Sequence, residues 1–176
     1  MSPRFHPGKR NSGAEFERTV LSHLDASYNL ARWILGDAHD AEDAVQDAAI
    51  RAFDAFPTFR GSDAKPWFLA IVRNGCMNRI RQRKDHRNLD WAAESSIDER
   101  SSPEQLVIKA WEAEAVQTAV AALPVDQREI VVLREFEDLS YKEIASVTGL
   151  PIGTVMSRLA RARSRLQVLL TEGACP

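Results

Sequence analysis

Apolar residues recur at helical spacing along most of the chain. The first half carries three such stripes: Phe16, Val20, Leu24, Tyr28, Ala31 and Leu35; then Val45, Ala49, Phe53 and Phe56; then Trp67, Phe68, Ile71, Val72, Cys76 and Ile80. Spacings of three and four residues are typical of amphipathic helices. Gly36 and Pro57 end the first two stripes, and Pro66 lies in the first turn of the third. Because no sustained strand-like alternation occurs, the first half is predicted to be a helical bundle.

The stripes stop in residues 89–104, which are acidic, rich in Ser and Ala, and poor in large apolar side chains. This composition is typical of a flexible linker. Helical periodicity resumes beyond it. The sequence therefore predicts an all-α protein with two small helical domains joined by a flexible linker. The predicted boundaries are a flexible tail over 1–13, a first domain over 14–88, the linker over 89–104 and a second domain over 105–172.

Residues 138–170 carry the most specific local signals. Ser140 and Glu143 have the spacing of a capping box, which predicts a helix start. Gly149 can take the positive φ that a tight turn needs. Ala145 and Val155 fit two helices that cross closely. Two short helices joined at a glycine are typical of a helix-turn-helix, whose second helix enters the major groove of DNA. An ordinary helical hairpin with a solvated basic face is the alternative.

Charge alternates along the chain in blocks. Residues 36–56 and 89–104 are acidic, whereas residues 65–88 and 140–170 are basic, so the formal net charge of −2 hides a strong pattern. Basic blocks suit phosphates, and acidic blocks suit a basic protein surface. The pattern predicts partners of both signs.

Other classes of protein fit less well. No apolar run is long enough to span a bilayer, and the N-terminus is not expected to be a signal peptide, so a cytoplasmic location is predicted. Neither of the two cysteines has metal-type spacing. Asp40, Asp43 and Asp47 could bind magnesium in a nucleic-acid enzyme, but no His or Cys completes a catalytic set. No metal, cofactor or catalytic residue is therefore expected.

The sequence LPVDQREIVVLREFEDLSYKEIA, from Leu123, and then GLPIGTVMSRLARAR, from Gly149, resembles region 4 of extracytoplasmic-function sigma factors. In that family, region 4 recognises the −35 promoter element. Residues on the outer face of the second helix would reach base edges, and nearby arginines would contact phosphates. The predicted −35 contacts are Thr154, Met156, Ser157, Arg158, Ala160, Arg161, Arg163 and Arg165.

The sequence DAHDAEDAVQDAAIRAF, from Asp37, resembles the polymerase-binding helix of the same family. Asp40, Asp43 and Asp47 fall on one helical face, where mutual repulsion costs stability unless a partner supplies cations. The resemblance implies that this partner is the clamp helices of the largest polymerase subunit. A merely solvated acidic face is the alternative. The predicted polymerase contacts are Asp40, Glu42, Asp43, Gln46, Asp47 and Arg51.

The sequence FRGSDAKPWFLAIVRN, from Phe59, resembles the −10-reading part of region 2. The resemblance implies a loop over 60–65 that captures a flipped base, followed by a basic helix that holds phosphates. Trp67 is either a core anchor or an alternative stacking platform. The predicted −10 contacts are Arg60, Gly61, Ser62, Asp63, Lys65, Arg73, Asn74, Arg79, Arg81 and Arg83.

The resemblance as a whole implies a non-enzymatic specificity subunit. Such a subunit binds core RNA polymerase, places it on promoter DNA and is held inactive by an anti-sigma factor, which could keep it at the membrane. The linker would thread through the polymerase. A stand-alone helix-turn-helix regulator is the alternative, but it leaves the acidic helix without a purpose.

Overall fold

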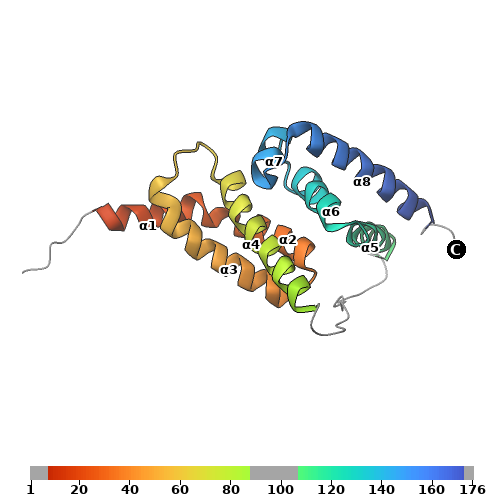
Figure 1. The fold of residues 1–176 in the computed structure, drawn as a ribbon, viewed down its shortest axis with the longest axis horizontal. Coiled ribbons are helices and arrows are strands. Elements are labelled where there is room, and N and C mark those ends of the chain that lie inside the picture. The colour runs from red at the N-terminus through yellow and green to blue at the C-terminus, as the bar shows by residue number, and fades with distance from the viewer. Residues whose placement is uncertain (1–7, 88–106, 173–176) are drawn as a thin grey trace, which may run out of the picture.

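The structure is a computed structural model of the 176-residue chain, and it describes residues 8–87 and 107–172 (Figure 1). The predicted linker, 89–104, lies outside the described residues. Every regular element within them is helical, as predicted. Residues 8–13, predicted to belong to a flexible tail, form the beginning of helix α1 (Gly8–Thr19), whose last turns are held by the buried Phe16.

The first unit is built from α2 (Leu24–Leu35), α3 (Ala38–Ala55) and α4 (Ala64–Arg87), which all contact one another. A 3₁₀ turn, η1 (Leu21–His23), precedes α2, and another, η2 (Phe56–Thr58), follows α3. Gly36 ends α2 with a φ of 79°. Four alanines give α3 a narrow buried face, so its neighbours approach closely: Ala41, Ala44, Ala48 and Ala52.

The second unit contains α5 (Val107–Ala121), α6 (Val125–Val131), α7 (Tyr141–Thr148) and α8 (Ile152–Glu172). A π-helical turn, η3 (Val132–Phe136), continues α6. The predicted helix-turn-helix is confirmed as α7 and α8. Gly149 ends α7 with a φ of 71°, and Val155 is fully buried where α8 packs on α7.

The predicted capping box is present at the start of α7. The Ser140 backbone N–H donates to Glu143 Oε2 at 2.6 Å, and the Glu143 N–H donates to Ser140 Oγ at 3.3 Å. The bonds from Ser140 hold the pKa of the Glu143 carboxyl below its ordinary value. The ionised form of Glu143 therefore stabilises the helix start, and this contribution is lost as the pH falls through the lowered pKa.

Replacing the capping serine, Ser140→Ala, is expected to lower the free energy of unfolding by about 0.5–2 kcal/mol, because the Glu143 N–H loses its acceptor. Urea denaturation followed by circular dichroism measures this change. Ser164→Ala, at an exposed position inside α8, is the matched control and should leave stability nearly unchanged. Equal effects of the two substitutions would show that the capping box does not stabilise the fold.

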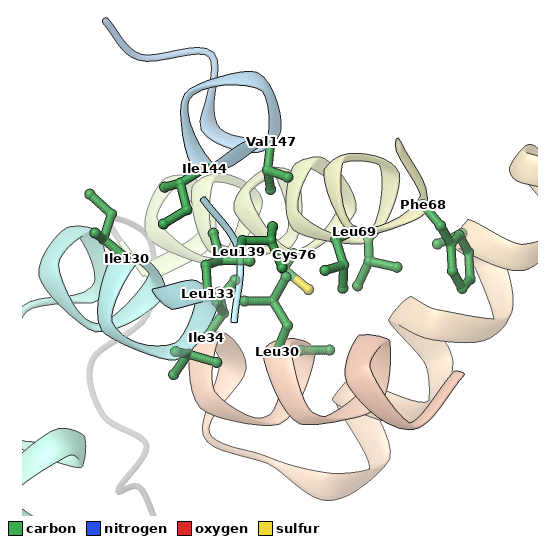
Figure 2. Close-up of a cluster of buried hydrophobic side chains, with 14 of the residues drawn as sticks. Leu30, Ile34, Phe68, Leu69, Cys76, Ile130, Leu133, Leu139, Ile144 and Val147 are labelled. Atoms are coloured by element: carbon green, nitrogen blue, oxygen red, sulfur yellow. The ribbon is translucent and has the colours of Figure 1, made fainter. Parts of the chain in front are cut away.

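The two units share one hydrophobic core. Helix α2 contacts α6, and α4 contacts α7. The side chains at this junction come from both units, as Figure 2 shows: Leu30, Ile34, Leu69, Cys76, Ile130, Leu133, Leu139, Ile144 and Val147. At its edge, the rings of Trp33 and Phe136 lie 5.9 Å apart between centroids. In this arrangement the units pack as one body.

Candidate functional site

Helix α3 carries the predicted polymerase contacts on its outer side, with Asp40 half-buried and the other five residues exposed. Two of its acids bind arginines of α4. Asp47 Oδ2 lies 2.5 Å from Arg79 Nη2, and Asp40 pairs with Arg83. The expectation that only a partner would supply cations is therefore wrong, because α4 packs beside α3 and supplies two. Such exposed pairs contribute about 0–1 kcal/mol each.

The rest of the face is open. Glu42 and Asp43 are exposed and form no ion pair with any residue that the structure describes. Gln46 lies one turn further on. Ile50, which the sequence pattern did not single out, follows on the same side and is 63% exposed. The sequence signal for an exposed Ile50 was its position outside the predicted apolar stripe of this helix, Val45, Ala49, Phe53 and Phe56. Together Glu42, Asp43 and Ile50 offer a basic protein partner two carboxylates and one apolar contact.

The loop between η2 and α4 holds four predicted −10 contacts, Arg60 to Asp63, and all four are exposed. Asp63 Oδ1 accepts the Lys65 backbone N–H at 2.9 Å and so caps α4. Arg60 Nη1 donates to the backbone oxygen of Pro57 at 2.7 Å. At Gly61 a Cβ atom would lie 2.7 Å from the Phe59 ring, so a larger residue there would have to displace that ring. These contacts fix the shape of the loop.

A row of aromatic rings underlies that loop. The ring of Phe59 lies 4.7 Å from that of Trp67 and 6.3 Å from that of Phe56, between centroids. Phe56 in turn lies 5.3 Å from Phe16. Trp67 is half-buried within this row. Its packing favours the role of a core anchor.

The cations of α4 do not form one surface. Arg73 turns to the second unit, where its Nε lies 2.8 Å from Glu129 Oε2 and its Nη2 lies 3.0 Å from Glu129 Oε1. Lys65 Nζ lies 3.1 Å from Glu137 Oε2. With Arg79 and Arg83 bound to α3, the predicted residues that remain on the outer side of α4 are Asn74 and Arg81.

Helix α8 presents most of the predicted −35 contacts together. Thr154 and Arg158 are half-buried, and the others are exposed: Met156, Ser157, Ala160, Arg161, Arg163 and Arg165. Arg158 pairs with Asp126 at 3.6 Å, and Arg163 pairs with Glu135 at 2.6 Å. Both pairs lie within the second unit and orient these arginines along its surface.

Arg161 and Arg165 lie beside an open hollow of about 510 Å³ between α6 and α8. Neither forms an ion pair with a residue of the described ranges. Their guanidinium groups are therefore available to phosphates or base edges.

Within the described ranges, 8–87 and 107–172, no group of three or more His, Cys, Asp and Glu side chains could hold a metal ion. Cys76 is buried in the shared core, and its burial raises the pKa of the thiol to about 12. No described helix is both long and apolar enough to cross a membrane.

Comparison with known proteins relates both units to the same protein family. Residues 19–86 match the family model "Sigma-70 region 2", and residues 113–166 match "Sigma-70, region 4". The ECF RNA polymerase sigma factor SigM of Mycobacterium tuberculosis is 35% identical over 156 residues, which cover 88% of this chain and 76% of SigM. The RNA polymerase sigma-H factor of Pseudomonas aeruginosa is 33% identical, over 93% of this chain and 92% of that protein.

Two solved structures are similar in fold. The sigma factor RpoE of Bartonella quintana, in complex with the anti-sigma factor NepR, aligns with a TM-score of 0.76 and 30% identity, over 89% of this chain and 97% of RpoE. CnrH, in complex with the cytosolic domain of CnrY, aligns with a TM-score of 0.63 and 25% identity, over 94% of this chain and 91% of CnrH.

Proposed function

Because the chain belongs to the extracytoplasmic-function sigma factors of the sigma-70 family, we propose that it binds core RNA polymerase through α3 and promoter DNA through the 60–65 loop and α8. It is a sigma factor, and it directs promoter-specific initiation of transcription. The polymerase performs the catalysis, and the complex acts in the cytoplasm.

The polymerase contact rests on the open part of α3. Glu42, Asp43 and Gln46 present two carboxylates and an amide to solvent, and Ile50 adds an apolar contact beside them. A basic helical surface of the polymerase clamp would neutralise the carboxylates and cover the isoleucine. Asp40, Asp47 and Arg51 contribute at the edge of this face. This face is the observation that carries the proposal.

The −35 contact rests on the geometry of α7 and α8. The capped α7 and the αL glycine after it hold the first turns of α8 outward, as a major-groove helix requires. Ser157, Ala160 and Arg161 lie on the exposed side of these turns. The more distal arginines lie where the sugar–phosphate backbone would pass.

The −10 contact rests on the loop before α4. Extruding a base from the duplex costs a few kcal/mol, so a loop that receives it has to be shaped beforehand. The Asp63 cap, the Arg60 bonds and the packing of Phe59 against Gly61 provide that shape. Arg81 would bind a phosphate of the captured strand directly. The cations of α4 that pair with carboxylates would have to exchange these partners for phosphates: Lys65, Arg73, Arg79 and Arg83.

The chain is also proposed to be controlled by an anti-sigma factor. RpoE, which shares its fold over 97% of its length, was solved with the anti-sigma factor NepR bound. A partner of this kind would prevent binding to core polymerase until a signal releases it. A membrane-anchored partner would hold the complex at the membrane.

Pull-down of core RNA polymerase by the purified chain, followed by transcription from a pool of promoters, tests the proposal. Binding and promoter-selective transcripts are expected. A folded chain that binds no core polymerase but binds duplex DNA as a dimer would instead identify a stand-alone regulator.

Removing one guanidinium from the recognition helix, Arg161→Ala, is expected to weaken binding to the preferred −35 sequence by about 1–3 kcal/mol, because a bidentate base contact is lost. Competition between promoters that differ at single −35 positions measures the effect. Arg165→Ala is the comparison, and a phosphate contact there predicts equal losses on all sequences. An equally uniform loss for Arg161→Ala would mark that residue as a phosphate contact too.

A further inference from the structure

Two buried carboxylates of the second unit face the first unit. Glu129 on α6 is fully buried, and Glu137, just after η3, is 8% exposed. Leaving an ionised carboxylate unpaired at such a site is costly, so each needs a partner within the fold. Both find a cation that belongs to α4.

The first pair is bidentate. Two guanidinium nitrogens of Arg73 donate to the two oxygens of Glu129, at 2.8 and 3.0 Å. The Arg73 side chain keeps only 16% of its surface exposed, so the pair is shielded from solvent. Fork-to-fork geometry of this kind is the strong form of an arginine–carboxylate contact.

The second pair is a small network. Lys65 Nζ lies 3.1 Å from Glu137 Oε2 and also donates to the Glu137 backbone oxygen at 2.8 Å. Asn29 Nδ2 on α2 donates to Glu137 Oε1 at 2.9 Å. The carboxylate thus joins both α2 and α4 of the first unit to the second.

Arg73 and Lys65 are also among the residues assigned to the −10 strand, so the inference rests on the proposed function. We infer that Glu129 and Glu137 bind Arg73 and Lys65 in the positions that DNA phosphates would take. The packed arrangement of the two units therefore excludes binding of the −10 strand. DNA and the second unit compete for the same side chains. Opening the junction frees both cations at once.

Cys76 gives the chain a natural probe of this opening, because it lies fully buried in the core that the two units share (Figure 2). We would work in a Cys175→Ser background, so that Cys76 is the remaining thiol. Glu129→Gln/Glu137→Gln removes both inter-unit ion pairs. Glu15→Gln/Glu17→Gln, which removes two exposed carboxylates of α1 and so changes the net charge equally, is the matched control.

Two readouts are needed. Alkylation of Cys76 by iodoacetamide at fixed pH should be at least tenfold faster in the double variant than in the parent chain. The affinity for a random-sequence single-stranded 12-mer should rise severalfold. Its salt dependence should steepen by about 0.7 per freed phosphate contact. The control should match the parent chain in both measurements.

An unchanged alkylation rate in a double variant that binds DNA like the parent would overturn the inference. Faster alkylation without tighter DNA binding would overturn the competition between DNA and the second unit. Circular dichroism identifies a double variant that fails to fold. Glu137→Gln alone, at the more accessible pair, then serves as the test, with the same two outcomes. Binding of core polymerase by the parent chain, measured in parallel, judges the proposed function separately.

Discussion

Charge reversal at one position of α3, Asp43→Lys, is expected to weaken binding to core RNA polymerase at least about a hundredfold. Asp43 is exposed and has no ion pair among the described residues, so it is available to a cation of the polymerase. Placing a like charge there costs several kcal/mol, and each 1.4 kcal/mol is about tenfold in affinity. Biolayer interferometry with immobilised core polymerase, at two salt concentrations, measures the loss.

Asp43 gives a cleaner test than Asp47. Reversing Asp47 would also remove the partner of Arg79, so its effect would mix binding with local structure. Glu17→Lys, at an exposed position of α1, changes the net charge by the same amount and is the control. Wild-type affinity in the Asp43 variant would show that the polymerase binds elsewhere.

The second large effect is expected at the junction of the two units. Leu133→Ala should lower the free energy of unfolding by about 2–5 kcal/mol, because Leu133 is fully buried and its truncation leaves a cavity. Urea denaturation followed by both circular dichroism and tryptophan fluorescence measures it. Since the units share a core, both probes should report one transition at a lower midpoint.

Val168→Ala is the matched control, because that side chain is 53% exposed and its loss should change stability by less than about 0.5 kcal/mol. Two separate transitions, of which Leu133→Ala shifts only one, would show that the units fold independently.

The local features of this fold could be predicted from the sequence, because each depends on residues close together in the chain. The apolar stripes predicted the helices. Ser140 and Glu143 predicted the start of α7, and Gly149 predicted its end. The resemblance to known sigma factors identified two whole regions, region 2 and region 4. The spacing of apolar residues alone does not identify them.

The contacts across the molecule could not be predicted in this way. Arg73 and Glu129 are 56 residues apart. A count of charges shows that α4 is basic, but it cannot tell whether an arginine meets a phosphate, a carboxylate of α3 or a carboxylate of the second unit. For the same reason the pairing of Asp47 with Arg79 could not be predicted. Which carboxylate an arginine binds depends on how the helices pack in the folded chain.

The π-helical turn η3 has a consequence for evolutionary comparison. The Glu137 N–H donates to the Val132 oxygen at 3.1 Å, five residues back, so this turn holds one residue more than an α-helical turn would. Because the wider turn already absorbs the extra residue, deleting one residue there would restore an α-helical turn and leave the next part of the chain in nearly the same orientation. Glu137 would then still face Lys65. An insertion or deletion of a single codon is therefore expected to be tolerated at this turn without loss of the contact between the units.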